Sequence, residues 1–286
     1  MKLSIITINR NNAVGLRKTM ESVFSQTYKD FEYIVVDGAS TDESVEVIRE
    51  YESVNCSSVQ PLPFTWISEP DTGIYNAMNK GCRIAKGEYT LMLNSADCLV
   101  DKCVLEKIIP ELHDDDIIQG NEIYEKNGSL YRDKGLGKSD LLFNDVLDGI
   151  FHHQVSFISN SLLAQMGYYD DSYKKGADTY FFINSLGLHN ASFRYVDVDV
   201  ANFDMNGIYG QQDPQWIAIG EQENKRFYDE NIPIRLQQFY KEASKRFRVY
   251  DLLKRNRIIW NLAMILVLIS EKIMGPIRKE IVEKID

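Results

Sequence analysis

Apolar and polar positions follow a strand-like pattern in some segments of the first hundred residues and a helix-like pattern in others. Short apolar runs at 3–8, 31–37, 64–68 and 89–94 have the length and composition of strands, and helix-like segments lie between them at 13–25, 42–51 and 73–85. This order predicts βαβ units. Runs such as "IVV" and "LML" are apolar on both faces, which is typical of a mostly parallel sheet flanked by helices.

The pattern changes further along the chain. The segments "DIIQGNEIYE" and "ASFRYVDVDV" indicate strands, a helix is expected to begin near Ala177, and the chain from Asp213 onward looks mainly helical. No repeat and no Pro- or Ser-rich linker interrupts it. We therefore expect residues 1–210 to form one α/β body and residues 211–286 to form a helical C-terminal extension.

Composition and charge exclude some classes of protein. The chain has 286 residues, 44% of them hydrophobic, and a net charge of -10, so it can bury a proper core but lacks the basic surface that nucleic acids require. Its four cysteines form no CxxC pair, which favours reduced thiols, and the N-terminus has too short an apolar run for a signal peptide. We expect a cytoplasmic protein without nucleic-acid partners.

The C-terminal extension is basic and then apolar. Residues 235–257 carry eight basic residues against two acids, and "IIWNLAMILVLIS" follows at 258–270. That apolar run is shorter than the roughly 20 residues needed to cross a bilayer. Residues 241–275 could instead lie in the plane of an anionic membrane at its inner face, or the run could form a core or dimer helix.

Polar side chains follow each of the four predicted strands. They are Thr7, Asn9 and Arg10 after the first, Asp37, Gly38, Ser40 and Asp42 after the second, Glu69, Pro70, Asp71 and Gly73 after the third, and Asn94, Ser95 and Asp97 after the fourth. In open α/β sheets, ligands bind beyond the carboxyl ends of the strands. No GxGxxG follows the first strand and no Walker A motif occurs, so a bound diphosphate would need another partner, such as a divalent cation.

Three groups of acids could hold such a cation. The run 114–116 lies between a helix and a strand and is most simply a solvated loop, while Asp197 and Asp199 share one face of a strand. Asp97 alone follows a buried strand. The local sequence leaves two interpretations of Asp97 open, a metal ligand or the N-cap of a following helix.

At this point the sequence resembles a known family. "LSIITINRNNAVGLRKTMESVFSQTYKDFEYIVVDGASTDESVEVI" and "SEPDTGIYNAMNKGCRIAKGEYTLMLNSADCL" are similar to the family 2 glycosyltransferases, and the resemblance extends from Leu3 to about Gly210. It implies the GT-A fold, with a nucleotide-binding half at 1–100 and an acceptor half at 101–210.

The resemblance also implies roles for single residues. Asp37 of "VDGASTD" matches the acid that helps to recognise the nucleotide base, with Gly38 in place of a second acid. Asp97 matches the last acid of the D-x-D element and would ligate Mn²⁺ or Mg²⁺. Donor or nucleotide binding is expected of a wider set: Thr7, Asn9, Arg10, Glu69, Asp71, Asn94 and Ser95. Asp71 is also a fair helix N-cap.

In the acceptor half, "HQ" and "AD" occupy the family's characteristic positions. Asp178 would be the general base that takes the proton of the acceptor hydroxyl, with a helix N-cap as its alternative role, and His153 and Gln154 would contact the acceptor or support the base. Gly207 and Tyr209 are candidates for a loop over the nucleotide.

The resemblance implies a metal-dependent, inverting enzyme that moves a sugar from a nucleotide diphosphate, UDP by family habit, to a glycan or lipid-linked acceptor in bacterial surface polysaccharide synthesis. The loss of acids at Asn94 and Ala96 leaves a second interpretation, a non-catalytic nucleotide-sugar binding or scaffold subunit. A third, a nucleotidyltransferase, is disfavoured because no Gly-rich, Arg-containing loop follows the first strand.

Overall fold

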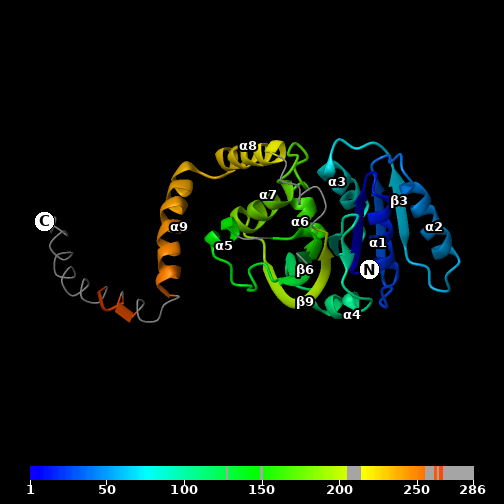
Figure 1. Cartoon of the computed structure of the whole chain (residues 1–286), viewed down its shortest axis with the longest axis horizontal. Coiled ribbons are helices and arrows are strands. Elements are labelled where there is room, and N and C mark those ends of the chain that lie inside the picture. The colour runs from blue at the N-terminus through cyan, green and yellow to red at the C-terminus, as the bar shows by residue number, and fades with distance from the viewer. Residues whose placement is uncertain (127, 149–150, 205–213, 255–260, 263, 267–286) are drawn as a thin grey trace. The chain divides into compact units, whose positions relative to one another are not determined.

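The computed structural model describes residues 1–126, 128–148, 151–204, 214–254, 261–262 and 264–266 (Figure 1). Two compact units divide the chain between Phe227 and Tyr228. Our functional boundary at residue 210 rests on the family resemblance and stays a prediction. Gly207 and Tyr209, and most of the apolar run 258–270, lie outside the described residues.

The first unit contains a mixed sheet whose strands, among the described residues, follow the order β3-β2-β1-β4-β8-β6-β9-β5, with β7 beside β6. Their bounds are β1 (Leu3–Asn9), β2 (Phe31–Asp37), β3 (Phe64–Ser68), β4 (Tyr89–Met92), β5 (Cys98–Leu99), β6 (Ile117–Lys126), β7 (Ser129–Asp133), β8 (Ser156–Ser159) and β9 (Phe193–Phe203). The strands expected in the first hundred residues are confirmed.

The helices begin close to where the apolar periodicity places them. Their bounds are α1 (Ala13–Phe24), α2 (Ser44–Cys56), α3 (Ile74–Ile84), α4 (Val104–Ile108), α5 (Phe143–Asp148), α6 (Asn160–Gln165), α7 (Ala177–Phe182), α8 (Pro214–Asn231) and α9 (Ile234–Lys254). Short 3₁₀ turns occupy η1 (Ile109–Glu111) and η2 (His153–Val155), and η3 (Ile183–Leu188) is π-helical. No helix in the described part of the chain is long and apolar enough to span a membrane.

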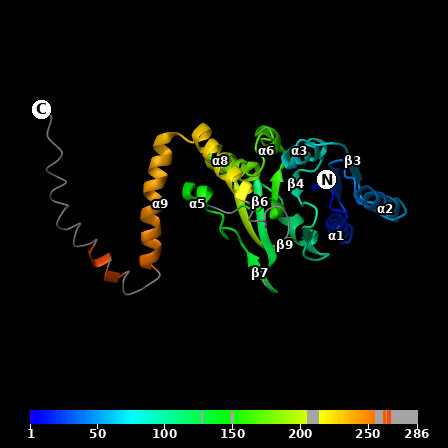
Figure 2. The ribbon, with the colours of Figure 1, turned by 45° about the horizontal axis from the view of Figure 1, so that its top comes forward.

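Strands β3, β2, β1 and β4 are parallel neighbours, as their two-sided apolar pattern predicts. The chain steps outward from β1 to β3 and then returns past β1 to β4. Because crossover connections are right-handed, this reversal places α1 and α2 on one face of the sheet and α3 on the other (Figure 2). The reversal also opens the carboxyl edge between β1 and β4.

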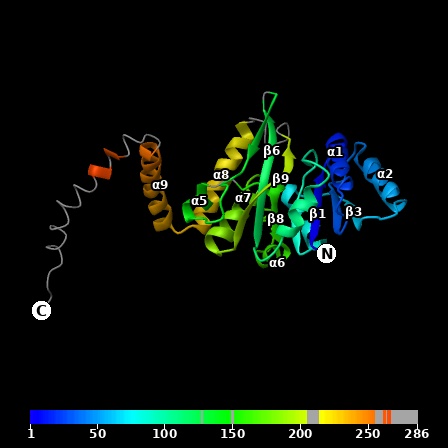
Figure 3. The ribbon, with the colours of Figure 1, turned by 90° about the horizontal axis from the view of Figure 1, so that it is seen from below.

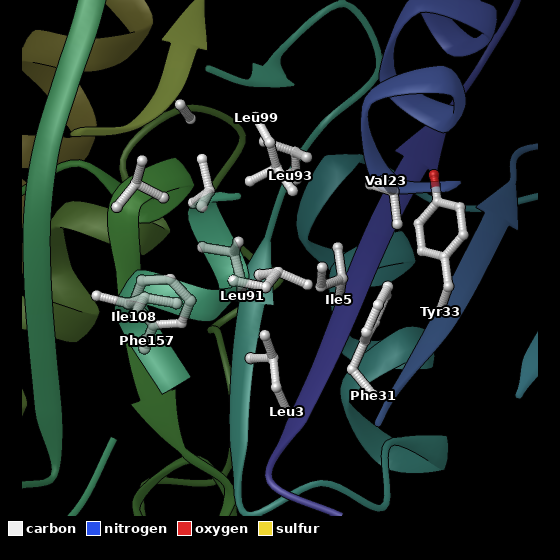
Figure 4. Packing of buried hydrophobic residues seen from close by; sticks show 14 of the residues in the cluster. Leu3, Ile5, Val23, Phe31, Tyr33, Leu91, Leu93, Leu99, Ile108 and Phe157 are labelled. Carbon is white, nitrogen blue, oxygen red and sulfur yellow. The ribbon is translucent and has the colours of Figure 1, made fainter. Parts of the chain in front are cut away.

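Apolar side chains cover both faces of these strands. Leu3 and Ile5 point into a buried cluster with Phe31 and Leu91 (Figure 4). On the other face α3 packs closely, because a Cβ at Gly81 would lie 2.5 Å from Cγ2 of Ile6. This two-sided burial holds the carboxyl ends of the strands in register.

Beyond β4 the sheet changes direction. Strand β8 runs antiparallel between β4 and β6, and β6 pairs in parallel with β9 (Figure 3). The register of β6 against β9 shifts on both sides of Asn121. An irregularity of this kind re-aims side chains, and here it lies next to the polar residues of η2.

Replacing Leu91 with alanine should lower the free energy of unfolding by about 2–5 kcal/mol, because a fully buried leucine leaves a cavity in the cluster. Urea unfolding followed by circular dichroism measures the change. Val14→Ala in α1 is the matched control, because that side chain is 86% exposed and should change stability little. An equal effect of the two substitutions would contradict this account of the core.

Candidate active site

Asp37 ends β2 as a fully buried carboxylate. It accepts hydrogen bonds from Nδ2 of Asn9 (3.0 Å), the backbone N–H of Ser40 (2.9 Å) and the hydroxyl of Ser68 (2.7 Å). These donors come from the ends of three neighbouring parallel strands. These hydrogen bonds fix the orientation of the Asp37 side chain at the edge of the sheet where the parallel strands end.

Gly38 gives room to a second carboxylate. A Cβ at this position would lie 2.2 Å from Oδ2 of Asp71, whose side chain is only 7% exposed. Asp71 also accepts from the N–H of Gly73 at 3.1 Å and lies 4.0 Å from Nη1 of Arg10. The N-cap position of α3 is occupied by Gly73, so Asp71 does not cap this helix. A carboxylate from the loop after β3 thus approaches the backbone at the position where the family has its second acid.

The chain after β4 forms a strained turn. The N–H of Asp97 donates to the carbonyl of Asn94 at 3.1 Å, and Ala96 between them has a φ of +88°, a conformation that favours glycine. The hydroxyl of Thr19 in α1 donates to the carbonyl of Asp97 at 2.6 Å and so holds the turn against the helix. The turn therefore places Asp97 directly before β5, at the carboxyl end of β4.

Asp97 is 5% exposed, and its Oδ1 accepts from the N–H of Asp204 at 3.1 Å. The chain continues into strand β5, so the N-cap interpretation is wrong. Burial raises the pKa of Asp97 to about 6, because the charged form loses its hydration. Stabilisation of the carboxylate would require a positive partner.

A divalent cation would fit this turn only in part. Oδ1 of Asn94 is buried without a hydrogen-bond partner, and together with Asp97 it offers hard oxygen ligands of the kind that Mg²⁺ and Mn²⁺ accept. In the described part of the chain, however, no group of three His, Cys, Asp or Glu side chains could hold a metal. Asn94 and Asp97 would hold a cation only together with other ligands, such as the oxygens of a bound diphosphate.

The other two acid groups are used within the fold. Oδ2 of Asp115 accepts from Arg194 at 2.6 Å. Asp197 and Asp199 share one strand face, as predicted, where Nδ2 of Asn121 donates to both at 2.9 Å. These hydrogen bonds join β6 to β9.

His153, which is buried, and Asp178, which is partly buried, form a pair. Nδ1 of His153 lies 3.1 Å from Oδ2 of Asp178, and Nε2 lies 3.0 Å from Nδ2 of Asn94. Burial is the largest single influence on the pKa of His153 and lowers it, but the hydrogen bond to Asp178 and the acidic charges nearby together outweigh burial and raise the pKa. Burial likewise opposes ionisation of Asp178, yet bonds from His153 and Tyr75 hold its pKa below the usual value. Asp178 is preceded by Gly176 and Ala177 and does not cap α7, so its alternative role is wrong.

Tyr75 of α3 joins the first hundred residues to this pair. Its hydroxyl lies 2.8 Å from Oδ1 of Asp178 and 2.6 Å from the carbonyl of Lys175. A phenol has one hydrogen, so it can donate fully to only one of these two acceptors at a time. When Asp178 takes up a proton, Tyr75 can accept from it and donate to the Lys175 carbonyl. The same hydrogen-bonded groups can therefore satisfy Asp178 in its charged and in its protonated form.

Glu223 of α8 holds the loop that leads to Asp178. Its carboxylate accepts from the backbone N–H groups of Lys174 (2.5 Å), Lys175 (3.0 Å) and Gly176 (3.3 Å). Three successive N–H groups directed at one carboxylate form a compact anion-binding loop. The loop is thus held by Tyr75 on one side and by Glu223 on the other.

A second buried group surrounds Glu122 of β6. Gln154 donates to its carboxylate, and Nδ1 of His152 lies 3.4 Å from Oε2. The other ring nitrogen of His152 lies 3.4 Å from Oδ2 of Asp133. Burial and the neighbouring acids Asp133 and Asp97 raise the pKa of Glu122 to about 8. Sequence analysis placed Gln154 near the acceptor but missed Glu122, whose only local signal is an acid within a strand.

The remaining predicted residues lie at the same edge but face different surroundings. The hydroxyl of Thr7 is buried and donates to the carbonyl of Leu93 at 2.7 Å, and the N–H of Ser95 donates to the carbonyl of Ile8. Glu69 is exposed and pairs with Lys80 at 2.9 Å. Thr7 therefore supports the sheet, whereas Arg10 and Glu69 are open to a ligand.

Comparisons with known sequences show which family the chain resembles over most of its length. The family described as "Glycosyl transferase family 2" matches residues 4–164. An uncharacterized glycosyltransferase of Mycobacterium tuberculosis is 30% identical over 216 residues, which cover 74% of this chain and 78% of the relative. A glycosyltransferase of Mycobacterium bovis named for PGL/p-HBAD biosynthesis is 28% identical over 212 residues, or 71% and 77% of the two chains.

Solved structures share the fold. TarS of S. aureus, solved also with UDP and UDP-GlcNAc, superposes with a TM-score of 0.58 at 19% identity, over 71% of this chain and 60% of the TarS fragment, less than two thirds of its length. A Pyrobaculum calidifontis mannosyltransferase in complex with GDP-Man and Mn²⁺ gives 0.58 at 16% identity, over 81% and 64%. These likenesses confirm the predicted GT-A fold.

Replacing Tyr75 with phenylalanine should raise the pKa of Asp178, because the charged carboxylate loses a hydrogen-bond donor while the ring stays in place. Carbon-13 NMR titration of labelled aspartate measures it. Tyr89→Phe, which removes a hydroxyl bonded to the Asp115 carbonyl, is the matched control and should leave Asp178 unaffected. An unchanged pKa in Tyr75→Phe would refute the proposed link.

Replacing Glu122 with glutamine should change how stability depends on pH. The folded protein keeps the Glu122 proton up to about pH 8, whereas the unfolded chain loses it near 4.5, so wild-type stability falls as pH rises between these values. The free energy of unfolding should fall by at most about 1.4 kcal/mol for each pH unit in this range. Urea unfolding from pH 5 to 8 should show Glu122→Gln gaining stability relative to wild type. A constant difference between the two proteins would show that Glu122 titrates normally.

Proposed function

This chain belongs to glycosyl transferase family 2, and we propose that it transfers a sugar from a nucleoside diphosphate donor to a glycan or lipid-linked acceptor in the synthesis of a surface polysaccharide. The observation that carries the proposal is the 3.0 Å contact between Asn94 and His153. It brings the turn expected to hold the diphosphate next to the pair expected to receive the acceptor proton. The proposed donor site and the proposed base are therefore neighbours at the edge of the sheet.

The reaction we propose is a single displacement with inversion. The acceptor oxygen forms a bond to the anomeric carbon, the bond from that carbon to the diphosphate breaks, and Asp178 takes the acceptor proton. His153 holds the carboxylate in position, and Tyr75 accommodates the added proton. The lowered pKa of Asp178 makes its carboxylate a weak base. A weak base suffices because the acceptor hydroxyl becomes acidic as its oxygen bonds to the anomeric carbon.

The donor would lie across the ends of β1, β2 and β4. We assign the nucleotide to Asp37 with Asn9, and the approach to the donor sugar to Asp71, Arg10 and Glu69. Asn94, Ser95 and Asp97 would face the diphosphate, where Asn94 and Asp97 would hold Mn²⁺ or Mg²⁺. A bound cation supplies positive charge to the leaving diphosphate. The family's habit favours UDP, while solved relatives carry UDP-GlcNAc in one case and GDP-Man in another.

The second unit suggests where the acceptor is found. Within residues 241–275 it presents Leu262 and Leu266, which are 57% and 66% exposed, after the exposed basic residues Lys241 and Lys245 of helix α9. Exposed apolar side chains beside basic ones are typical of helices that lie on anionic membranes. We propose that residues 241–275 contact the inner face of the cell membrane and bring the enzyme to a lipid-linked acceptor.

Calorimetric titration of UDP and GDP, with and without Mn²⁺, tests the donor site. One nucleotide should bind in a Mn²⁺-dependent manner, and Asp97→Asn should weaken that binding at least about tenfold, because a charged ligand of the metal becomes neutral. Asp101→Asn is the matched control, since Asp101 is half exposed and pairs with Lys107. Equal, metal-independent binding by wild type and Asp97→Asn would contradict the assignment and favour a scaffold subunit.

A further inference from the structure

The hairpin of β6 and β7 extends outward from the active site. In its register Glu122 lies opposite Asp133 and Tyr124 lies opposite Tyr131. Residues two apart along a strand share a face, so these four side chains lie on the same face of the hairpin. They form two successive rungs, one acidic and one aromatic.

The acidic rung contacts the active site. His152 lies between its two carboxylates, at 3.4 Å from each, and Gln154 donates to Glu122. His152 and Gln154 flank His153, the partner of Asp178. The hairpin face is therefore continuous with the place where we expect the acceptor hydroxyl.

The aromatic rung follows about 7 Å further along the strands, given a rise of about 3.4 Å per residue. The rings of Tyr124 and Tyr131 stack with centroids 5.4 Å apart and an angle of 14° between their planes. Tyr131 is 46% exposed. Stacked rings with free edges offer a flat apolar surface with polar hydroxyls at its border.

The opposite face of the hairpin is used differently. Asn121 donates to Asp197 and Asp199, and Arg132 also pairs with Asp199. These contacts attach the hairpin to β9. The two faces are therefore distinct, and the face of Glu122 and Tyr131 is the one directed toward the site.

We propose that this face binds the acceptor glycan beyond its reacting sugar. This inference rests on the proposed function and specifies its acceptor as a chain of at least two sugar rings. Tyr124 and Tyr131 stack against the C–H face of the second ring, and Asp133, whose side chain is 30% exposed, hydrogen-bonds a hydroxyl between the rings. The Asp133 carboxylate would repel a phosphate, so the face suits a neutral glycan better than a lipid headgroup or a second diphosphate.

Saturation-transfer NMR with defined sugars tests the inference on the full chain. The probes are cellobiose, maltose, galactobiose and N,N′-diacetylchitobiose, each compared with its own monosaccharide. At least one disaccharide should bind about five- to tenfold more tightly than its monosaccharide, a gain of the size that ring stacking provides. Tyr131→Ala should abolish this gain, and Tyr131→Phe should retain it.

Leu130→Ala is the matched control. Leu130 is 74% exposed on the same hairpin and lies opposite Glu125, on the other face, so its removal should not affect disaccharide binding. Thermal unfolding of each variant checks the fold. Equal disaccharide affinity of Tyr131→Ala and wild type, or no gain for any disaccharide, would overturn the inference. Failure of wild type to bind UDP or GDP would instead refute the proposed function itself.

Discussion

The candidate active site depends on one partly buried carboxylate, Asp178, that must be kept partnered. An ionised carboxylate is costly away from water unless other groups hydrogen-bond to it. Asp178 meets this requirement through Nδ1 of His153 and the hydroxyl of Tyr75 in α3, and Nε2 of His153 lies 3.0 Å from Nδ2 of Asn94 in the turn after β4. Tyr75 and Asn94 both belong to residues 1–100. The same contacts therefore hold Asp178 close to the turn after β4, where we propose that the donor binds.

Departures from the family's motif are accommodated by neighbouring backbone and side chains. Where a second acid is expected, Gly38 leaves space that the Asp71 carboxylate approaches. In the turn after β4, Ala96 adopts a conformation usually left to glycine, and Thr19 holds the carbonyl of Asp97. The site retains acids from two different loops although its D-x-D element keeps only the last one.

The sequence predicted the parallel half of the sheet and the group of polar residues at its edge, because the spacing of apolar residues and the ends of strands are local properties of the chain. It did not predict Tyr75, Glu122 or Glu223 as parts of the site. Tyr75 and Asp178 are 103 residues apart, and Gln154 and Glu122 are 32 apart, so no local pattern joins them. The N-cap interpretation of Asp97 failed because pairing of β5 with β9 draws the chain into a strand.

The central claim is that the chain cleaves a sugar nucleotide at the anomeric carbon and that Asp178 takes the acceptor proton. Phosphorus-31 NMR of UDP- and GDP-sugars incubated with the protein, Mn²⁺ and extracted membrane lipid measures this most directly. We expect one donor to be converted to its nucleoside diphosphate by wild type, and conversion to be lost in Asp178→Asn. Release of pyrophosphate, no conversion by wild type, or equal conversion by the variant would contradict the account.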